Sequence, residues 1–197
     1  MEFRLLGWPE DDVLVRLDHR AYAYAGKFAM SSTGKAVALD DGQRFRIPEE
    51  PKREYVAPVG IVAFSEDRTD PGALWLRYVS VRRERRREGV GPRLCAFVVA
   101  RAAERGYERV RIAVNNAYSY EALHKVGFAW TGRETGIAEL VLERPAGEPA
   151  AVDPAQYRAG LDTIAARDDV DDAERAFAER KRERGPPPVD DSAPEDT

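Results

Sequence analysis

The sequence predicts an α/β fold, a mixed β-sheet with helices on its faces, followed by a helical extension. The order of periodic segments is strand, helix, three strands, helix, strand, helix and hairpin, which is typical of such a sheet. Hydrophobic residues make up 43% of the 197 positions, enough to bury a core. At Pro145 the periodic pattern gives way to proline, alanine and glycine. These observations indicate one folded domain and a separate C-terminal region.

Four strands and one helix are expected in the first part of the chain. The segment 11–24 has apolar side chains at helical spacing after an acidic opening, PEDD, which suits a helix N-terminus. A valine-rich run and the next apolar run, ALWLRYVSV, are separated by a TDPG turn and are expected to be strands. The expected strands are 2–7, 35–42, 55–67 and 73–81, with a surface loop at 43–54.

In the second part of the domain, the sequence predicts two helices, each flanked by strands. The segment 92–106 is alanine-rich, has proline in its first turn and ends before a glycine, as a helix should. A strand at 107–115 and a short helix at 119–127 follow. Residues 128–134 and 137–143 meet at a threonine–glycine turn and are expected to form a hairpin.

The chain is expected to divide into three parts. Residues 1–145 form the main domain, and 146–184 form a linker with helices at about 154–167 and 170–184. The end, 185–197, is rich in proline and acidic residues and is expected to be disordered.

Composition excludes several classes of protein. A net charge of −4 and a pI near 5.4 disfavour a general nucleic-acid binder. One cysteine, Cys95, and two distant histidines, His19 and His124, provide no metal-ligand spacing, so no metal is expected. The N-terminus lacks a signal-peptide core and no apolar run is long enough to span a bilayer. We therefore expect a cytoplasmic protein that acts without a membrane.

The run RRERRREGVGPRL at 82–94 is the strongest functional signal in the sequence. It joins a predicted strand to a predicted helix, and a glycine turn there exposes backbone N–H groups to an anion. Neighbouring arginines suit phosphate. A dinucleotide fingerprint would need a third glycine where Leu94 stands, and SSTGKA at 31–36 lacks the glycine and hydroxyl of a phosphate loop. The run predicts a diphosphate site.

Two motifs indicate a family. The stretch from Arg86 to Gly91 has the form R-x-x-G-x-G, and downstream Asn116, Ser119 and the pair Gly127-Phe128 stand at matching spacing. Together they resemble the acyl-CoA-binding and following segments of the GNAT N-acetyltransferase superfamily. The resemblance covers about residues 2–143 and implies the GNAT-like, mostly antiparallel sheet of that superfamily.

The resemblance also implies where acetyl-CoA binds. In this superfamily the pantetheine arm lies against a splayed strand and the pyrophosphate lies at the glycine turn. An asparagine reaches the pantetheine region from the other side. The implied cofactor-binding residues are Val79, Ser80, Val81, Arg86, Arg87, Glu88, Gly89, Val90, Gly91 and Asn116.

The catalytic positions differ from the family pattern. A glutamate is expected on the strand before the glycine turn, but Trp75 stands there. Leu123 replaces the usual tyrosine acid. Tyr120, about one helical turn earlier, is the expected substitute acid, with Tyr118 as a second candidate. Glu66 is the expected base, with the adjacent Asp67 as its alternative.

The expected activity is acetyl transfer to an amine by direct attack in a ternary complex. A lysine amine costs about 4–5 kcal/mol to deprotonate at pH 7 and an α-amine only about 1 kcal/mol, so a weak base favours an amine of low pKa. The acceptor is expected to be a small-molecule or peptide amine, and a homodimer is possible. The alternative is a non-catalytic acyl-CoA-binding or partner-binding module on the same fold.

Overall fold

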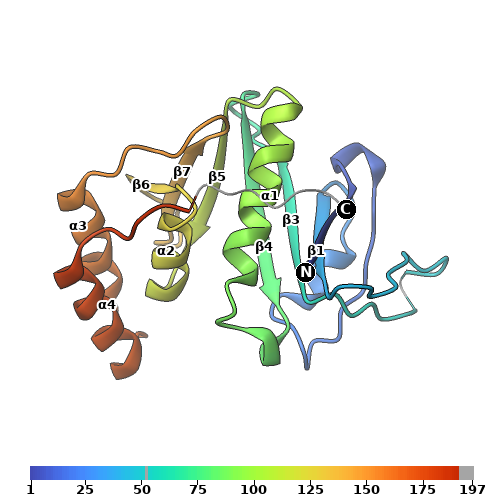
Figure 1. Cartoon of the computed structure of the whole chain (residues 1–197), viewed down its shortest axis with the longest axis horizontal. Coiled ribbons are helices and arrows are strands. Elements are labelled where there is room, and N and C mark those ends of the chain that lie inside the picture. The colour runs from blue at the N-terminus through green and yellow to red at the C-terminus, as the bar shows by residue number, and fades with distance from the viewer. Residues whose placement is uncertain (52, 191–197) are drawn as a thin grey trace.

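The computed structural model describes residues 1–51 and 53–190. Within them, seven strands form one sheet in the order β1-β2-β3-β4-β5-β7-β6 (Figure 1). The strands are β1 (Glu2–Gly7), β2 (Gly34–Leu39), β3 (Gly60–Glu66), β4 (Ala73–Val81), β5 (Arg109–Val114), β6 (Ala129–Glu134) and β7 (Leu140–Pro145). Every neighbouring pair is antiparallel except β4 and β5, which are parallel. The prediction of a mixed, mostly antiparallel sheet is confirmed.

The helices also follow the prediction. They are α1 (Val90–Glu104), α2 (Ala117–His124), α3 (Pro154–Ala165) and α4 (Asp172–Arg184). Each predicted helix from 92 onward is confirmed, with its ends within one turn of those expected. Short 3₁₀ turns occupy Pro9–Asp11, Ala25–Ala29 and Arg83–Arg85. Every helix among the described residues is too short or too polar to cross a bilayer.

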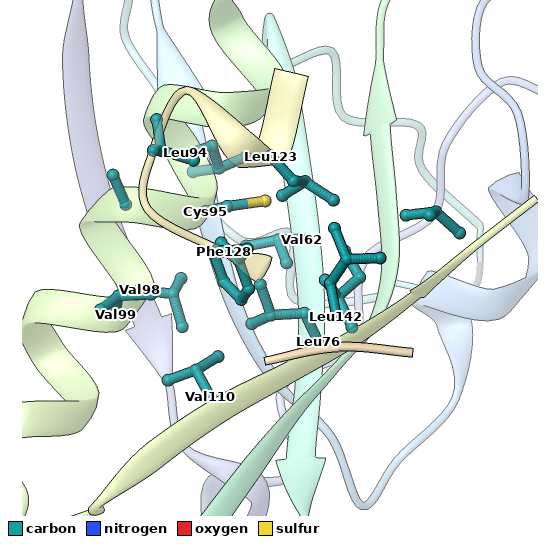
Figure 2. Close-up of a cluster of buried hydrophobic side chains, with 14 of the residues drawn as sticks. Val62, Leu76, Leu94, Cys95, Val98, Val99, Val110, Leu123, Phe128 and Leu142 are labelled. Carbon is teal, nitrogen blue, oxygen red and sulfur yellow. The ribbon is translucent and has the colours of Figure 1, made fainter. Parts of the chain in front are cut away.

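One face of the sheet is covered by α1 and α2. Helix α1 lies across the middle of the sheet in Figure 1. Its buried side chains pack on Val62 of β3, Leu76 of β4 and Val110 of β5 (Figure 2). Full burial of each such aliphatic side chain contributes about 1.5–3 kcal/mol. This apolar layer fixes the position of α1 against the central strands.

The prediction of a helix over 11–24 is wrong. Asp12 has a left-handed backbone (φ 49°), which ends the 3₁₀ turn, and the chain beyond it is irregular. Val15 and Leu17 are both buried, with half-buried Val13 packed against the same cluster. Apolar residues two apart indicate extended chain. Buried residues in this segment therefore recur every two positions and not every 3.6, as they would in a helix. The segment covers the sheet face opposite α1.

Lys35 ties this irregular segment to β2. The side chain is fully buried. Its Nζ donates to the carbonyls of Val13, Met30 and Thr33 and to the Thr33 hydroxyl. A buried ammonium is tolerated only when such hydrogen bonds replace water. Lys35, in the glycine–lysine pair at 34–35, therefore has a structural role.

The C-terminal extension packs on α2. Glu121 of α2 is buried and accepts from the Tyr157 hydroxyl and from Lys181 Nζ (2.6 Å). Helices α3 and α4 lie side by side at the end of the sheet that carries β6 and β7 (Figure 1). The first six residues of the tail predicted to be disordered are also placed, with the Asp190 N–H donating to the Lys125 carbonyl (2.7 Å). Residues 191–197 lie outside the described residues.

A substitution at Gly160 tests the packing of α3 on α2. A Cβ at Gly160 would lie 2.6 Å from Cζ of Tyr120, whereas one at Gly147 would meet nothing within 4 Å. Overpacking exceeds the gain in helix propensity, so we expect Gly160→Ala to lower the free energy of unfolding by about 1–2 kcal/mol. Gly147→Ala should leave it unchanged in the same urea titration. Equal stability of the two variants would contradict close α2–α3 contact.

Candidate functional site

The sheet opens where β4 leaves β5. The two strands pair in parallel only from Ala73 to Leu76, opposite Arg109 to Ile112. Beyond Leu76, the edge of β4 that faces β5 has no strand partner among the described residues, although its other edge stays paired with β3 up to Val81. We call this opening the slot. An unpaired strand edge has backbone N–H and C=O groups free for a ligand.

The N-terminus of α1 lies beside the slot. Gly89 has a left-handed backbone (φ 76°) and precedes the helix. Among the described residues no side chain caps this end, and Pro92 has no N–H, so the amides of Val90 and Gly91 are open to an anion. A Cβ at Gly91 would lie 3.6 Å from Val81 and 3.8 Å from Val79. The structure thus brings Gly91 to the unpaired part of β4.

The loop arginines divide into two groups. Arg85 pairs with Asp40 (2.8 Å) and with Glu88 (2.9 Å), while Arg82 donates to the Tyr22 hydroxyl (3.3 Å) and holds the irregular segment. Arg86 and Arg87 are exposed, and no carboxylate in the described residues pairs with either. The positive charges of these two arginines are therefore available to a phosphate.

Ser80 has an orphan hydroxyl. It lies in the unpaired part of β4 and is 3% exposed, yet its Oγ has no hydrogen-bond partner within the described chain. A buried polar atom without a partner requires an explanation, and a ligand or water in the slot would supply one.

Asn116 stands where β5 gives way to α2. Its Oδ1 accepts from the Ser119 N–H (2.8 Å), so the side chain caps α2. Its Nδ2 donates to Asn115 (3.2 Å). The residue is half-buried, and part of its hydrogen-bonding capacity is already used.

The structure does not bring Tyr120 to the slot. The side chain is fully buried and its hydroxyl donates to the Tyr157 carbonyl (3.1 Å). Burial raises the pKa of Tyr120 far above its ordinary value. The expectation that Tyr120 is the catalytic acid is therefore corrected: its hydroxyl is sealed between α2 and α3. Leu123 lies in the apolar core (Figure 2), and the ring of Tyr118 packs on Phe177 with centroids 4.6 Å apart.

The opposite face of the sheet carries an open groove of about 830 Å³. Arg77 and Tyr78 line it, and they are the first two β4 residues beyond the pairing with β5. The groove and the slot therefore meet at this point of β4. Other lining residues come from the chain between β1 and β2, from the end of β3 and the β3–β4 turn, from β4 and from β6, including Met30, Thr33, Glu66, Asp67, Trp75 and Arg133.

Asp67 and Arg111 hold the floor of the groove. Asp67 accepts from Trp75 Nε1 (2.6 Å), Arg111 (2.8 Å) and Thr69 (2.8 and 2.9 Å). Burial raises the pKa of Asp67, but hydrogen bonds from Thr69, Trp75 and Arg111 lower it by more, to well below its usual range. Asp67 is therefore a fixed anion with both oxygens engaged.

Glu66 is the freer carboxylate. It is exposed and accepts from the Tyr107 hydroxyl (2.9 Å) through Oε1. Burial and the bond to Glu66 raise the pKa of Tyr107 to about 12, so this phenol stays protonated. In the described part of the chain Oε2 of Glu66 has no hydrogen-bond partner.

Slot, helix N-terminus and groove define an α/β protein that can hold an extended, phosphate-bearing ligand on one face and a second molecule on the other. Residues 9–128 match the model of the Acetyltransferase (GNAT) family, and the chain belongs to that family, whose members are enzymes.

Several solved N-acetyltransferase structures are similar to this chain. Nourseothricin acetyltransferase is 18% identical, with a TM-score of 0.49 over 74% of this chain and 98% of that one. A GCN5-related N-acetyltransferase from Kribbella flavida is 22% identical (TM-score 0.44; 57% and 67% covered). The PaiA N-acetyltransferase from Thermoplasma acidophilum, in complex with coenzyme A, is 14% identical (0.43; 56% and 59%). No curated protein matches the chain significantly.

The sequence analysis missed Arg77 and Arg111 as site residues. A signal for Arg77 was present, because Trp75 and Arg77 are two apart in β4 and share a face opposite Leu74 and Leu76. Of the three carboxylates on Arg111, two come from the β3–β4 turn and one from β7, all remote from β5 in the sequence, so no local pattern could have indicated them.

Asp67→Asn tests the groove floor. Because the folded pKa of Asp67 is depressed, its stabilisation is present above about pH 4 and is lost as the pH falls further. We expect Asp67→Asn to cost about 1–3 kcal/mol at pH 7, and the difference from wild type to shrink below pH 4. Urea unfolding from pH 2.5 to 7 measures this, with exposed Asp168→Asn as the control. A difference that does not change with pH would contradict the assignment.

Tyr120→Phe tests the corrected role of Tyr120. The hydroxyl bonds only inside the protein, so its removal should cost about 1 kcal/mol of stability and leave kcat within about twofold of wild type. Steady-state kinetics and thermal unfolding of the variant check both. A fall in kcat of a hundredfold or more would restore Tyr120 as the acid.

Proposed function

We propose that the protein transfers an acetyl group from acetyl-CoA to an amine by direct attack within a ternary complex. The observation that carries this proposal is the meeting of slot and groove at Arg77 and Tyr78 of β4. A cofactor in the slot and an acceptor in the groove would approach one point from opposite faces, which is the geometry that direct transfer needs. Residues 1–145 carry both sites in this proposal, and 146–184 support α2.

The residues of the slot fit acetyl-CoA. The backbone of Val79 to Val81 would hold the extended pantetheine arm, and the Ser80 hydroxyl would gain a partner. The open amides of Val90 and Gly91, with Arg86 and Arg87, would hold the pyrophosphate, together with the turn at Glu88 and Gly89. Asn116 would complete the opposite side. Acetyl-CoA, when bound, supplies the acetyl group as a reactive thioester.

Glu66 is the proposed base. A reacting amine must lose a proton, and Oε2 of Glu66 is free to take it directly or through water. Asp67 is a poorer base because its pKa is held well below the usual range and both its oxygens accept hydrogen bonds. With Leu123 apolar and Tyr120 sealed, water is the proposed proton source for the departing sulfur.

The acceptor is a small-molecule or peptide amine in this proposal. The groove is open along the sheet, and its volume of about 830 Å³ is within the range of small-ligand sites.

Thermal stabilisation by acetyl-CoA tests the proposal. At about 100 times its dissociation constant, the cofactor should add about 2.7 kcal/mol to the free energy of unfolding, whereas ATP and NAD should not. Gly91→Ala should stabilise the free protein slightly, since its Cβ meets only ordinary contacts, and yet weaken acetyl-CoA about tenfold or more. Arg86→Ala should weaken binding about ten- to hundredfold.

Arg180→Ala is the matched control, because it removes the same charge from the exposed face of α4. Stabilisation without CoA release from any amine would favour the alternative of a non-catalytic acyl-CoA-binding module. No stabilisation of a folded protein by acetyl-CoA would contradict both.

A further inference from the structure

The acceptor groove carries arginines that lack acidic partners. Arg68, Arg77 and Arg133 line it and are all exposed. In residues 1–51 and 53–190, none of the three forms an ion pair with a carboxylate. Elsewhere on this protein arginines are commonly paired, as Arg85, Arg109 and Arg111 are.

Of these arginines, Arg77 makes the most side-chain hydrogen bonds within the described residues. Its Nε donates to Ser65 Oγ (2.8 Å) and its Nη2 to the Glu66 carbonyl (3.2 Å). Its guanidinium lies 5.2 Å from the centre of the Trp75 ring. The β3–β4 register shifts between Ala63 and Phe64, so Arg77 has no direct partner across β3. The held guanidinium keeps its remaining N–H groups for a ligand, with little entropy left to lose.

Glu66, Asp67 and Glu134 are the carboxylates that line the groove with Arg77, and none of them pairs with it in the described residues. Asp67 is bound by Trp75 and Arg111, and Glu66 accepts from Tyr107. Arg111, in turn, is paired with Asp67, Asp70 and Glu143. The charge of Arg111 is neutralised from within the protein, whereas the charge of Arg77 is left for the groove.

Resting on the function proposed above, we infer that the acceptor carries an anionic oxygen group, a carboxylate or a phosphate, and that Arg77 binds it, with Arg68 and Arg133 adding charge. Arg77 stands where β4 leaves β5, so an anion bound there holds the amine of the same molecule at the mouth of the slot. Polycationic amines are disfavoured, because the same arginines repel them. Amino acids and phosphorylated amines form the acceptor class.

Matched acceptors test this inference. The probes are L-amino acids, their carboxamides, and O-phosphoethanolamine beside ethanolamine, each with acetyl-CoA and full-length protein. We expect kcat/KM for the anionic member of each pair to exceed that of the neutral member about ten- to hundredfold. This preference would run against amine basicity, because a carboxamide leaves more of its amine unprotonated at pH 7. The two pairs distinguish a carboxylate acceptor from a phosphate acceptor.

Variants assign the preference to Arg77. Arg77→Gln should raise KM for the anionic acceptors about ten- to hundredfold more than for the neutral ones, and Arg77→Lys should restore part of the loss. Arg133→Gln is a second variant, at an exposed position in the same groove, and Arg180→Gln on α4 is the control. Equal use of anionic and neutral acceptors by wild type would overturn the inference while leaving the proposed activity intact.

Acceptor binding gives a readout without turnover. Calorimetry of the same amines on the CoA-saturated protein should show tighter binding of the anionic member by wild type, and equal binding of both by Arg77→Gln. Absence of CoA release from every amine would refute the proposed activity, yet this titration would still decide the anion site. No binding of any anionic amine, or equal binding of both members by wild type, would overturn the inference.

Discussion

The separation of β4 from β5 after Leu76 is the constraint on which the rest of the structure depends. A parallel pair that stayed closed to Val81 would leave no free strand edge at β4. Because β4 remains paired with β3 from Leu74 to Val81, interrupted only at Arg77, it diverges without losing its own support. Val79 and Val81, in the unpaired part, pack against the same apolar core as α1, which keeps this part in place.

Arg111 fixes the closed end of this opening. From β5 it pairs with Asp67 and Asp70 of the β3–β4 turn and with Glu143 of β7, so one side chain joins three parts of the sheet. Trp75 adds its N–H to Asp67. With that end rigid, the place where the strands part is set, and with it the positions of Arg77 and Tyr78. Preorganisation of this kind keeps two ligands aligned without reordering the protein.

Much of the fold could be predicted from sequence, and the exceptions have physical reasons. The β4 strand and α1 follow from local periodicity and end signals, and the glycine turn between them predicts the anion site proposed above. The helix prediction after Asp12 was wrong because the buried residues Val15 and Leu17 lie two positions apart in an irregular segment. Tyr120 was misassigned because Gly160, from a distant helix, lets α3 close over it. Contacts between remote segments leave no local signal.

Backbone amide hydrogen exchange, with and without acetyl-CoA, tests the central claim most directly. Ligand in the slot would occupy the free edge of β4 and the open amides of α1. The account predicts slower exchange in peptides covering 77–81 and 89–93, with no change in β1 and β2. Unchanged exchange in both segments under saturating acetyl-CoA, or protection confined to another part of the chain, would contradict it.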